Sequence, residues 1–280
     1  MKIGFIGAGK VGFSLGKFFT QGGIPVTGYY SRHRDSAKEA AIFTGTKQYD
    51  ELEGFVSDSD ALFLTVPDGE ITSVYQEVRK FHILGKIICH CSGVMTAGEA
   101  FPAISQTGAY AYSIHPLFPF SSKYETYREL PGAFFCLEGD GPHIDAFRDM
   151  FQRLGISIHV LSGDQKVKYH AACAISSNLV CALVQESLEL LGECGFPKEL
   201  ALKALTPLIQ SNITHILNDG PMEALTGPVE RGDVSTVKKH LDCFNRDEER
   251  ELYRVVSKKL AELAVCKNPD RDYSVLNELL

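Results

Sequence analysis

Short apolar runs alternate with amphipathic segments over residues 1–162 of the chain. The runs are rich in Val, Ile, Leu and Phe, as expected for strands buried inside a sheet. They fall at residues 3–6, 26–30, 45–49, 61–66, 86–90, 109–114, 134–137 and 157–161. Segments of helical spacing lie between several of them, at residues 11–19, 35–44, 71–81 and 144–154. Strands that alternate with helices predict an α/β fold with a doubly wound, Rossmann-type parallel sheet.

The pattern changes at residue 163, after which no convincing strand follows. A long, nearly all-apolar helix is expected over residues 166–194, and Gly195-Phe196-Pro197 ends it. Further helices are expected at residues 198–217, 234–244 and 247–266. The sequence therefore predicts a dinucleotide-binding domain at residues 1–162 and an all-α second domain at residues 163–280, which would bind substrate or pair two chains.

The turn after the first strand is a complete G-x-G-x-x-G motif. It reads Gly7-Ala8-Gly9-Lys10-Val11-Gly12 and leads directly into a helical pattern. In such a turn the first glycine permits the tight bend, the second lets the backbone approach a pyrophosphate, and the third lets the helix pack closely on the strand. The start of the helix offers unpaired N–H groups to the phosphates. We expect Gly7, Gly9, Lys10, Val11 and Gly12 to bind the cofactor.

The end of the second strand indicates which dinucleotide would bind. An NAD site has an acidic residue there for the ribose 2′-hydroxyl, whereas this chain has Ser31, Arg32, His33 and Arg34 before the first acid, Asp35. A guanidinium binds a 2′-phosphate, which a carboxylate repels. We interpret Ser31 and Arg32 as the 2′-phosphate pocket, with Arg34 as a second candidate, and predict NADP as the cofactor.

Composition and charge narrow the range of partners. The net charge is -7, and no long basic stretch occurs among the 280 residues, which argues against nucleic acid or an anionic membrane as a partner. No apolar run approaches the roughly 20 residues of a membrane span, and the chain opens on a strand rather than a signal peptide. The cysteines form no C-x-x-C pair, so no metal site is expected and the cytoplasm is the expected compartment.

Three other strand ends of the first domain carry candidate residues. Ligands of an open parallel sheet bind beyond the carboxyl ends of its strands, so we expect Val66, Pro67, Ser92 and Gly93 to line the cofactor site. His115 follows another strand and precedes an aromatic-rich loop that would exclude water. A histidine there can protonate an atom that becomes basic during hydride transfer, although hydrogen bonding to the loop backbone would equally explain it.

The second domain contributes three further candidates. His170 and Asn178 lie on one face of the long helix if that helix is unbroken, and a polar contact between helices is the alternative explanation. Arg231 lies in the non-periodic stretch at residues 226–233 and could bind a substrate carboxylate. Asp233 is expected to cap the next helix, and Asp68 to cap the helix after the 61–66 strand.

Seven stretches occur in the order seen in one family. They are Gly7-Ala-Gly-Lys-Val-Gly12, Ser31-Arg32, Val66-Pro67-Asp68, His90-Cys-Ser-Gly93, Ser113-Ile-His-Pro-Leu-Phe118, Lys168-Tyr-His-Ala-Ala172 through Asn178, and Leu225-Thr-Gly-Pro-Val-Glu-Arg-Gly-Asp233. Over essentially its whole length the chain resembles the predicted NADP oxidoreductases that join a Rossmann-like domain to a C-terminal helical domain of unknown function. These belong to the 6-phosphogluconate dehydrogenase-like superfamily and are related to pyrroline-5-carboxylate reductase. The resemblance implies a fold and a cofactor, but no substrate.

Two other families are similar only in part. The His-Pro-Leu-Phe at residues 115–118 is similar to the His-Pro-Met of prephenate dehydrogenases. The Lys-x-x-Asn signature of β-hydroxyacid dehydrogenases is absent, since Ala171 takes the place of the asparagine at that spacing from Lys168.

The function expected from these observations is an NADP(H)-dependent oxidoreductase. It would move a hydride to or from a small polar carbonyl, imine or alcohol, with His115 and His170 transferring protons or binding substrate and Asn178 and Arg231 orienting it. We expect a homodimer, because the helices of the second domain are broadly apolar, and the alternative is that one chain buries them internally. The alternatives are a non-catalytic NADP-binding sensor or partner-binding protein, and a protein that binds some other nucleotide.

Overall fold

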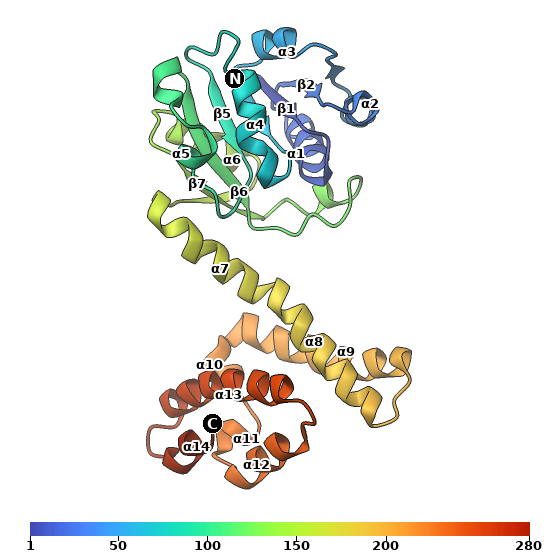
Figure 1. Ribbon diagram of the computed structural model, residues 1–280, viewed down its shortest axis with the longest axis vertical. Coiled ribbons are helices and arrows are strands. Elements are labelled where there is room, and N and C mark those ends of the chain that lie inside the picture. The colour runs from blue at the N-terminus through green and yellow to red at the C-terminus, as the bar shows by residue number, and fades with distance from the viewer. The chain divides into compact units, whose positions relative to one another are not determined.

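The computed structural model describes all residues from Met1 to Leu280 (Figure 1). They form two compact units, Met1–Ser177 and Asn178–Leu280. Each unit is described by itself. The helical part of the chain begins at residue 163, as expected, but the first eleven-residue helix of that part, α7 (Lys166–Ser176), belongs to the first unit.

The first unit is built on one sheet of eight strands in the order β3-β2-β1-β4-β5-β6-β7-β8. The strands are β1 (Ile3–Ile6), β2 (Val26–Tyr30), β3 (Lys47–Gln48), β4 (Ala61–Leu64), β5 (Ile87–His90), β6 (Tyr110–Pro116), β7 (Phe134–Glu138) and β8 (Ser157–Val160). The order of β1 to β6 is that of a Rossmann fold, and the expectation of this fold is confirmed. Both β2 and β4 pair with β1 in parallel register, so the order reverses beside the glycine turn.

One strand pairing departs from the parallel expectation. β7 runs antiparallel to β6, with Ile114 opposite Leu137, and β8 continues parallel to β7. The connection from β6 to β7 contains only the short 3-10 turn η2 (Thr126–Arg128) and no α-helix. A parallel pairing needs a crossover, usually helical, so the lack of a helical pattern between residues 117 and 133 is the signal for this reversal.

Helices cover both faces of the sheet, which buries the strands on both sides. One face packs against α1 (Lys10–Gln21), α2 (Arg34–Thr44) and α6 (Ile144–Arg153), through side chains such as Phe13, Ala40 and Phe151. The other packs against α3 (Leu52–Asp58), α4 (Asp68–Val78) and α5 (Ala97–Ala100), through Phe55 and Tyr75. The 3-10 turns η1 (Ile104–Thr107) and η3 (Gly163–Gln165) complete the unit.

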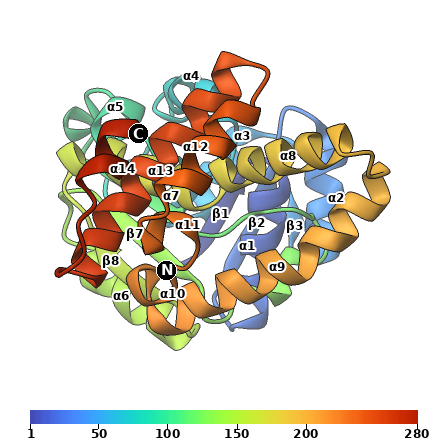
Figure 2. The same cartoon turned by 90° about the horizontal axis from the view of Figure 1, so that it is seen from below.

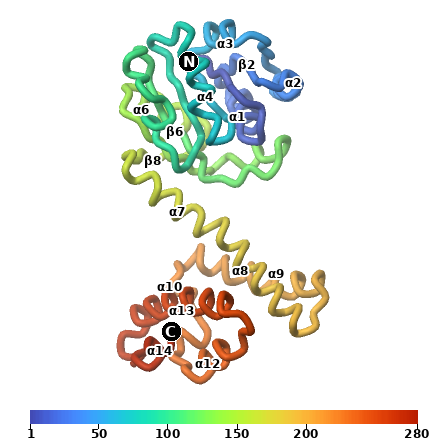
Figure 3. The backbone as a smooth tube through the Cα atoms, viewed as in Figure 1, coloured from blue at the N-terminus to red at the C-terminus, as the bar shows by residue number.

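The connection between β6 and β7 crosses to helix α1, as the green tube of Figure 3 shows. The Tyr124 ring packs edge-on against Phe13 of α1 and Phe43 of α2. This aromatic loop therefore covers α1 rather than only the tip of β6 from which it starts.

The second unit is helical throughout, as expected. Its helices are α8 (Asn178–Glu193), α9 (Lys198–Asp219), α10 (Pro221–Ala224), α11 (Pro228–Arg231), α12 (Val234–Cys243), α13 (Asp247–Lys267) and α14 (Ser274–Leu279). Figure 2 shows α8 and α9 as a pair, and the two helices contact each other. A small core around Val237, Leu241, Ala261 and Ala264 joins α12, α13 and their neighbours. The short helices α10, α11 and α14 were not expected, because each is too short to show helical periodicity.

The long helix expected over residues 166–194 is broken. Ser177 has φ -125° and ψ -73°, which ends α7, and α8 begins at Asn178. The prediction of one continuous helix was wrong because the apolar pattern runs through the break without a proline or glycine to mark it. His170 and Asn178 therefore lie on two different helices and not on one helical face, as was expected.

The same stretch also departs from the expectation that no part of the chain is long and apolar enough to span a membrane. By length and composition, Gly163–Glu193 qualifies as a candidate membrane span, with a mean hydropathy of 1.3 over its best window and none of that window buried. Polar residues are scattered through the stretch and interrupt every apolar run, yet its average hydropathy stays high.

Candidate cofactor and active site

The glycine turn has the geometry that the motif predicts. Gly7 has a positive φ of 103°, and a Cβ on it would lie 2.8 Å from the Thr65 carbonyl oxygen. A Cβ on Gly12 would lie 2.6 Å from the Gly7 oxygen and from Thr65 Oγ1. A Cβ on Gly9, in contrast, would have only the Thr65 oxygen within contact range, at 4.0 Å. Gly7 and Gly12 are therefore required by the fold itself, whereas the lack of a side chain at Gly9 leaves room for a ligand.

The start of helix α1 is suited to bind an anion. Its N-cap is Gly9, whose neighbours include no side chain that caps the first turn, and that turn carries no acidic residue. The first N–H groups of a helix have no partner inside the helix, and its N-terminus carries a partial positive charge. Together with exposed Lys10, this start has the features of the phosphate-binding element expected at residues 7–12.

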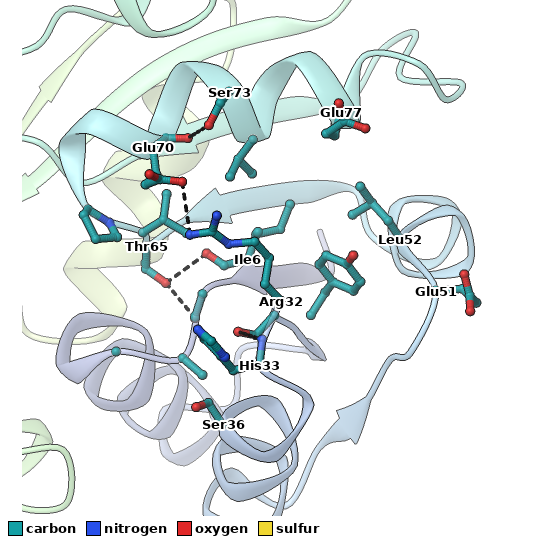
Figure 4. Close-up of a pocket in the computed structure, with 18 of the residues that line it drawn as sticks. Ile6, Arg32, His33, Ser36, Glu51, Leu52, Thr65, Glu70, Ser73 and Glu77 are labelled. Carbon is teal, nitrogen blue, oxygen red and sulfur yellow. Dashed lines mark hydrogen bonds and ion pairs between the residues drawn. The ribbon is translucent and has the colours of Figure 1, made fainter.

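A cavity of about 700 Å³ adjoins the glycine turn. It is lined from the carboxyl ends of β1, β2 and β4 and from helices α2, α3 and α4 (Figure 4). Among the predicted cofactor residues, Gly7, Gly9, Ser31, Arg32, Val66 and Pro67 line it. Lys10, Val11 and Gly12 follow the turn into α1, and Ser92 and Gly93 lie beyond the tip of β5. A cavity of this size at the point where the strand order reverses is the expected place for a nucleotide.

The Arg32 side chain reaches across this cavity, as Figure 4 shows, and pairs with Glu70 of α4 at 3.1 Å. The Arg32 side chain is 72% exposed, so it is free to contact a bound ligand as well. Ser31 accepts a hydrogen bond from the His33 N–H through its hydroxyl oxygen at 3.2 Å. Arg34 instead pairs with Asp50, with 3.5 Å between Nε and Oδ1. Of the two candidate arginines, only Arg32 lines the cavity.

At the tip of β5, the side chain of Ser92 is buried, and its hydroxyl donates to Asp68 Oδ2 at 2.6 Å. Asp68 is the first residue of α4, and Pro67 occupies its N-cap position. The expectation that Asp68 caps this helix through its side chain was wrong, because the carboxylate accepts from Ser92 instead. The hydrogen bond ties the β4 tip to the β5 tip, two of the predicted ligand-binding positions.

A second cluster forms where β5, β6 and α7 meet. His115 Nδ1 is 2.6 Å from the Tyr169 hydroxyl oxygen, and the His115 and His170 ring centroids are 5.9 Å apart. Both rings lie against Gly93, since a Cβ there would be 2.4 Å from His170 Cδ2 and 2.8 Å from His115 Nε2. The structure therefore brings together Gly93, His115 and His170, which the sequence proposed independently.

The environment of His115 favours its neutral form. Burial lowers its pKa to about 4, and the positive charge of Lys166 and the neighbouring His170 contribute. Burial likewise raises the pKa of Tyr169 far above its ordinary value. With Nδ1 held by the Tyr169 hydroxyl, a neutral imidazole presents Nε2 toward Gly93 as a hydrogen-bond donor or acceptor, depending on the tautomer.

Asn178 and Arg231 lie in the other unit. Asn178 opens α8, Arg231 closes α11, and both side chains are exposed. Asp233 caps α12, accepting from the Thr236 N–H at 3.0 Å, which confirms the expectation of an N-cap. Nothing in the second unit alone groups Asn178 with Arg231, so their roles stay predictions.

Several side chains of these sites were not predicted from the sequence. Glu70 and Thr65 shape the cavity, and Lys166 is buried beneath the histidine cluster. Lys166 and Lys168 both lie at the start of the expected helix, so the sequence predicts an exposed, charged position for each of them. Only the fold, which brings Ser92 and Ser113 against it, distinguishes it from Lys168.

Comparison with protein-family models gives two matches. Residues 1–116 match the Rossmann-like domain, and residues 133–260 match the domain of unknown function DUF2520. Together the matches cover most of the chain, so the resemblance described above is confirmed. The chain thus joins a Rossmann-like domain to a DUF2520 domain. A comparison with curated proteins gives no match.

Several solved structures are similar over most of the chain. Protein TM1727 from Thermotoga maritima is 25% identical, with a TM-score of 0.72 over 95% of this chain and 99% of that one. A protein from Bacteroides fragilis whose name proposes an NADP oxidoreductase is 20% identical, with a TM-score of 0.70 over 93% and 98%. An imine reductase from Myxococcus stipitatus, in complex with NADP+, is 18% identical, with a TM-score of 0.62 over 99% of both chains. The likeness of these structures to the chain confirms the predicted fold.

Proposed function

We propose that the protein is an NADP(H)-dependent oxidoreductase. The observation that carries the proposal is the cavity at the glycine turn, where a helix start without a side-chain cap would face the phosphates of a dinucleotide and Arg32 reaches across from the end of β2. These groups match a dinucleotide with a phosphorylated ribose. The names of two similar structures, one of them in complex with NADP+, support the same cofactor.

The substrate class follows from the second cluster. The bound nicotinamide would supply or accept a hydride. A carbonyl, imine or alcohol that exchanges a hydride also gains or loses a proton, and a positioned histidine can carry it. His115 is neutral and held by Tyr169, so its Nε2 can hydrogen-bond a substrate oxygen or nitrogen, with His170 beside it. We propose a small polar carbonyl, imine or alcohol as substrate, with Asn178 and Arg231 orienting it.

The test is a panel of carbonyl and imine compounds mixed with the protein and NADPH, with NADPH oxidation as the readout. We expect turnover of at least one compound, lost on Gly9→Ala and reduced about a hundredfold or more on His115→Asn. Lys168→Met, an exposed change on the same helix as His170, is the matched control and should leave the rate unchanged. NADPH binding without oxidation of any compound would favour a non-catalytic sensor instead.

We further propose a homodimer. Helices α8 and α9 carry exposed apolar side chains, among them Leu208, which is 66% exposed, and Leu217, which is 78% exposed. Exposed apolar surface of this extent is a mark of an interface, and a second copy would cover the same surface on both chains. Sedimentation should give twice the mass of the chain. The Leu208→Asp, Leu217→Asp double variant should be monomeric. The control variant Ile42→Asp, at an exposed position of α2, should remain dimeric.

We also propose that the protein acts in the cytoplasm on a small molecule. The buried thiols of Cys89 and Cys136 lie inside the sheet, as reduced cysteines of an intracellular protein do. Fractionation of cells should recover the protein with soluble markers. Recovery with membranes would instead assign the apolar stretch of α7 and α8 to a lipid bilayer.

A further inference from the structure

Lys166 is a buried cation beneath the histidine cluster. Its residue is only 2% exposed. The ammonium group donates to the Ser92 carbonyl oxygen at 3.2 Å and to the Ser113 hydroxyl oxygen. Ser113 in turn donates to the same Ser92 oxygen at 3.2 Å. One lysine of α7 thus connects the tip of β5 to strand β6.

The cost of burying this lysine is not offset by a direct ion pair. Both of its acceptors are neutral oxygens. The Glu138 and Asp68 carboxylates act on it through space, while Glu138 accepts the Ala97 N–H and Asp68 accepts the Ser92 hydroxyl. Burial lowers the pKa of Lys166. A buried ammonium without a bonded counter-ion destabilises a fold, so a stability role alone does not explain a lysine at this position.

We propose that Lys166 is a positioning residue of the histidine cluster: its ammonium group holds the Ser92 carbonyl and thereby fixes the Gly93 backbone against which the His115 and His170 rings lie. Gly93 directly follows Ser92, and its missing Cβ is what gives both rings their space. A shift of this backbone would therefore displace His115 Nε2. That a displaced His115 would transfer protons less well rests on the proposed function. The effect of Lys166 on the position of the two rings does not.

The charge of Lys166 acts on His115 as well. The groups that face His115 are Lys166, Tyr169 and His170 from α7, Asp68 from α4, His90 from β5 and, through Tyr169, Cys136 from β7. Lys166 is the strongest charged influence on His115 after burial, and it lowers the pKa of that imidazole, while Asp68 raises it. Removal of the Lys166 charge should therefore let His115 bind a proton at higher pH.

The experiment follows the His115 imidazole of the full-length chain by NMR as the pH is lowered, with no cofactor or substrate present. In the unchanged protein, the His115 signals should stay at their neutral positions well below pH 6.5, the ordinary pKa of histidine. In Lys166→Met, they should begin to move at higher pH, and the Gly93 amide should exchange with solvent faster. Lys168→Met removes a charge from the same helix at an exposed position and should change neither.

Glutamine separates the two effects and serves if the methionine variant does not fold. Lys166→Gln removes the charge but keeps a hydrogen-bond donor, so the His115 shift should appear while the Gly93 amide stays protected. A folded Lys166→Met chain whose Gly93 amide exchanges as slowly as in the unchanged protein would overturn the proposal. An unchanged His115 titration in folded Lys166→Met and Lys166→Gln would overturn the effect of the Lys166 charge. Because no cofactor or turnover enters the measurement, that outcome is distinct from a failure of the proposed function.

Discussion

The Arg32 guanidinium pairs with the Glu70 carboxylate at 3.1 Å across the cavity at the glycine turn. Arg32 follows β2 and Glu70 lies in the first turn of α4, so the pair links the two elements on either side of the expected ribose position. A 2′-phosphate that binds Arg32 brings negative charge close to Glu70. The site therefore contains both a residue that attracts the phosphate and one that opposes it.

Replacing Arg32 by Ala should weaken NADPH binding by about tenfold or more, since a charge-assisted contact to phosphate is lost. NADH lacks the phosphate, and its affinity should change by less than about twofold. Calorimetric titration of both cofactors measures this. Arg34→Ala is the matched control, because Arg34 pairs with Asp50 outside the cavity. An equal loss for both cofactors would assign Arg32 to some other role.

Replacing Glu70 by Gln should have the opposite effect. The carboxylate competes with the phosphate for Arg32, and exposed ion pairs of this kind contribute about 0.2–1 kcal/mol. NADPH should therefore bind about two- to fivefold tighter, with little change for NADH. Glu77→Gln, in the same cavity but without an ion pair to Arg32, controls for the general charge of the site. Weaker NADPH binding in Glu70→Gln would show that the pair orients Arg32 rather than competing for it.

Alanine at Gly9 and at Gly12 should separate ligand contact from folding. A Cβ at Gly12 meets backbone at 2.6 Å, whereas one at Gly9 meets nothing closer than 4.0 Å. Gly12→Ala should lower the free energy of unfolding by about 1–3 kcal/mol through overpacking. Gly9→Ala should leave stability within about 0.5 kcal/mol and still abolish cofactor binding. Denaturant unfolding together with a cofactor titration checks both, and the reverse ranking of stabilities would contradict the geometry.

Stability should depend on pH through two histidines. Burial lowers the pKa of His115 to about 4 and that of His90 to about 3, from 6.5. At any pH between these lowered pKa values and 6.5, the unfolded chain therefore binds more protons than the folded chain. The free energy of unfolding should fall as the pH drops below about 6.5. The slope is at most about 1.4 kcal/mol per pH unit for each histidine.

A substitution at His115 separates its contribution to the pH dependence of stability from that of other groups. Denaturant unfolding at a series of pH values should give a shallower slope for His115→Gln than for the unchanged protein. His82→Gln, at an exposed position, should leave the slope as it is. If His115→Gln and His82→Gln gave the same slope, His115 would not be a buried neutral imidazole.

The sequence predicted the fold well where local pattern determines structure. The eight apolar runs and the glycine turn are local signals, and the strands and the start of α1 follow from them. The break at Ser177 and the reversal at β7 were missed. The apolar pattern runs through the break without a proline or glycine to mark it. The reversal could have been inferred from the lack of a helical pattern between residues 117 and 133.

Part of the candidate site could also be predicted from the sequence. Gly7, Arg32 and Val66 follow strands whose carboxyl ends meet at one edge of the sheet, so topology alone brings them together. His115 and His170 were proposed from different segments, and the structure places them beside each other. Lys166 could not be distinguished from Lys168 by sequence, because its burial depends on serines more than 50 positions away.

Hydrogen exchange of backbone amides with and without NADP+ tests the central claim most directly. The claim is that the cavity beside the glycine turn holds the dinucleotide. We predict slower exchange at residues 7–12 and 31–36 on addition of NADP+ and a smaller effect of NAD+. Unchanged exchange at the glycine turn with saturating NADP+, or protection confined to other segments, would contradict it.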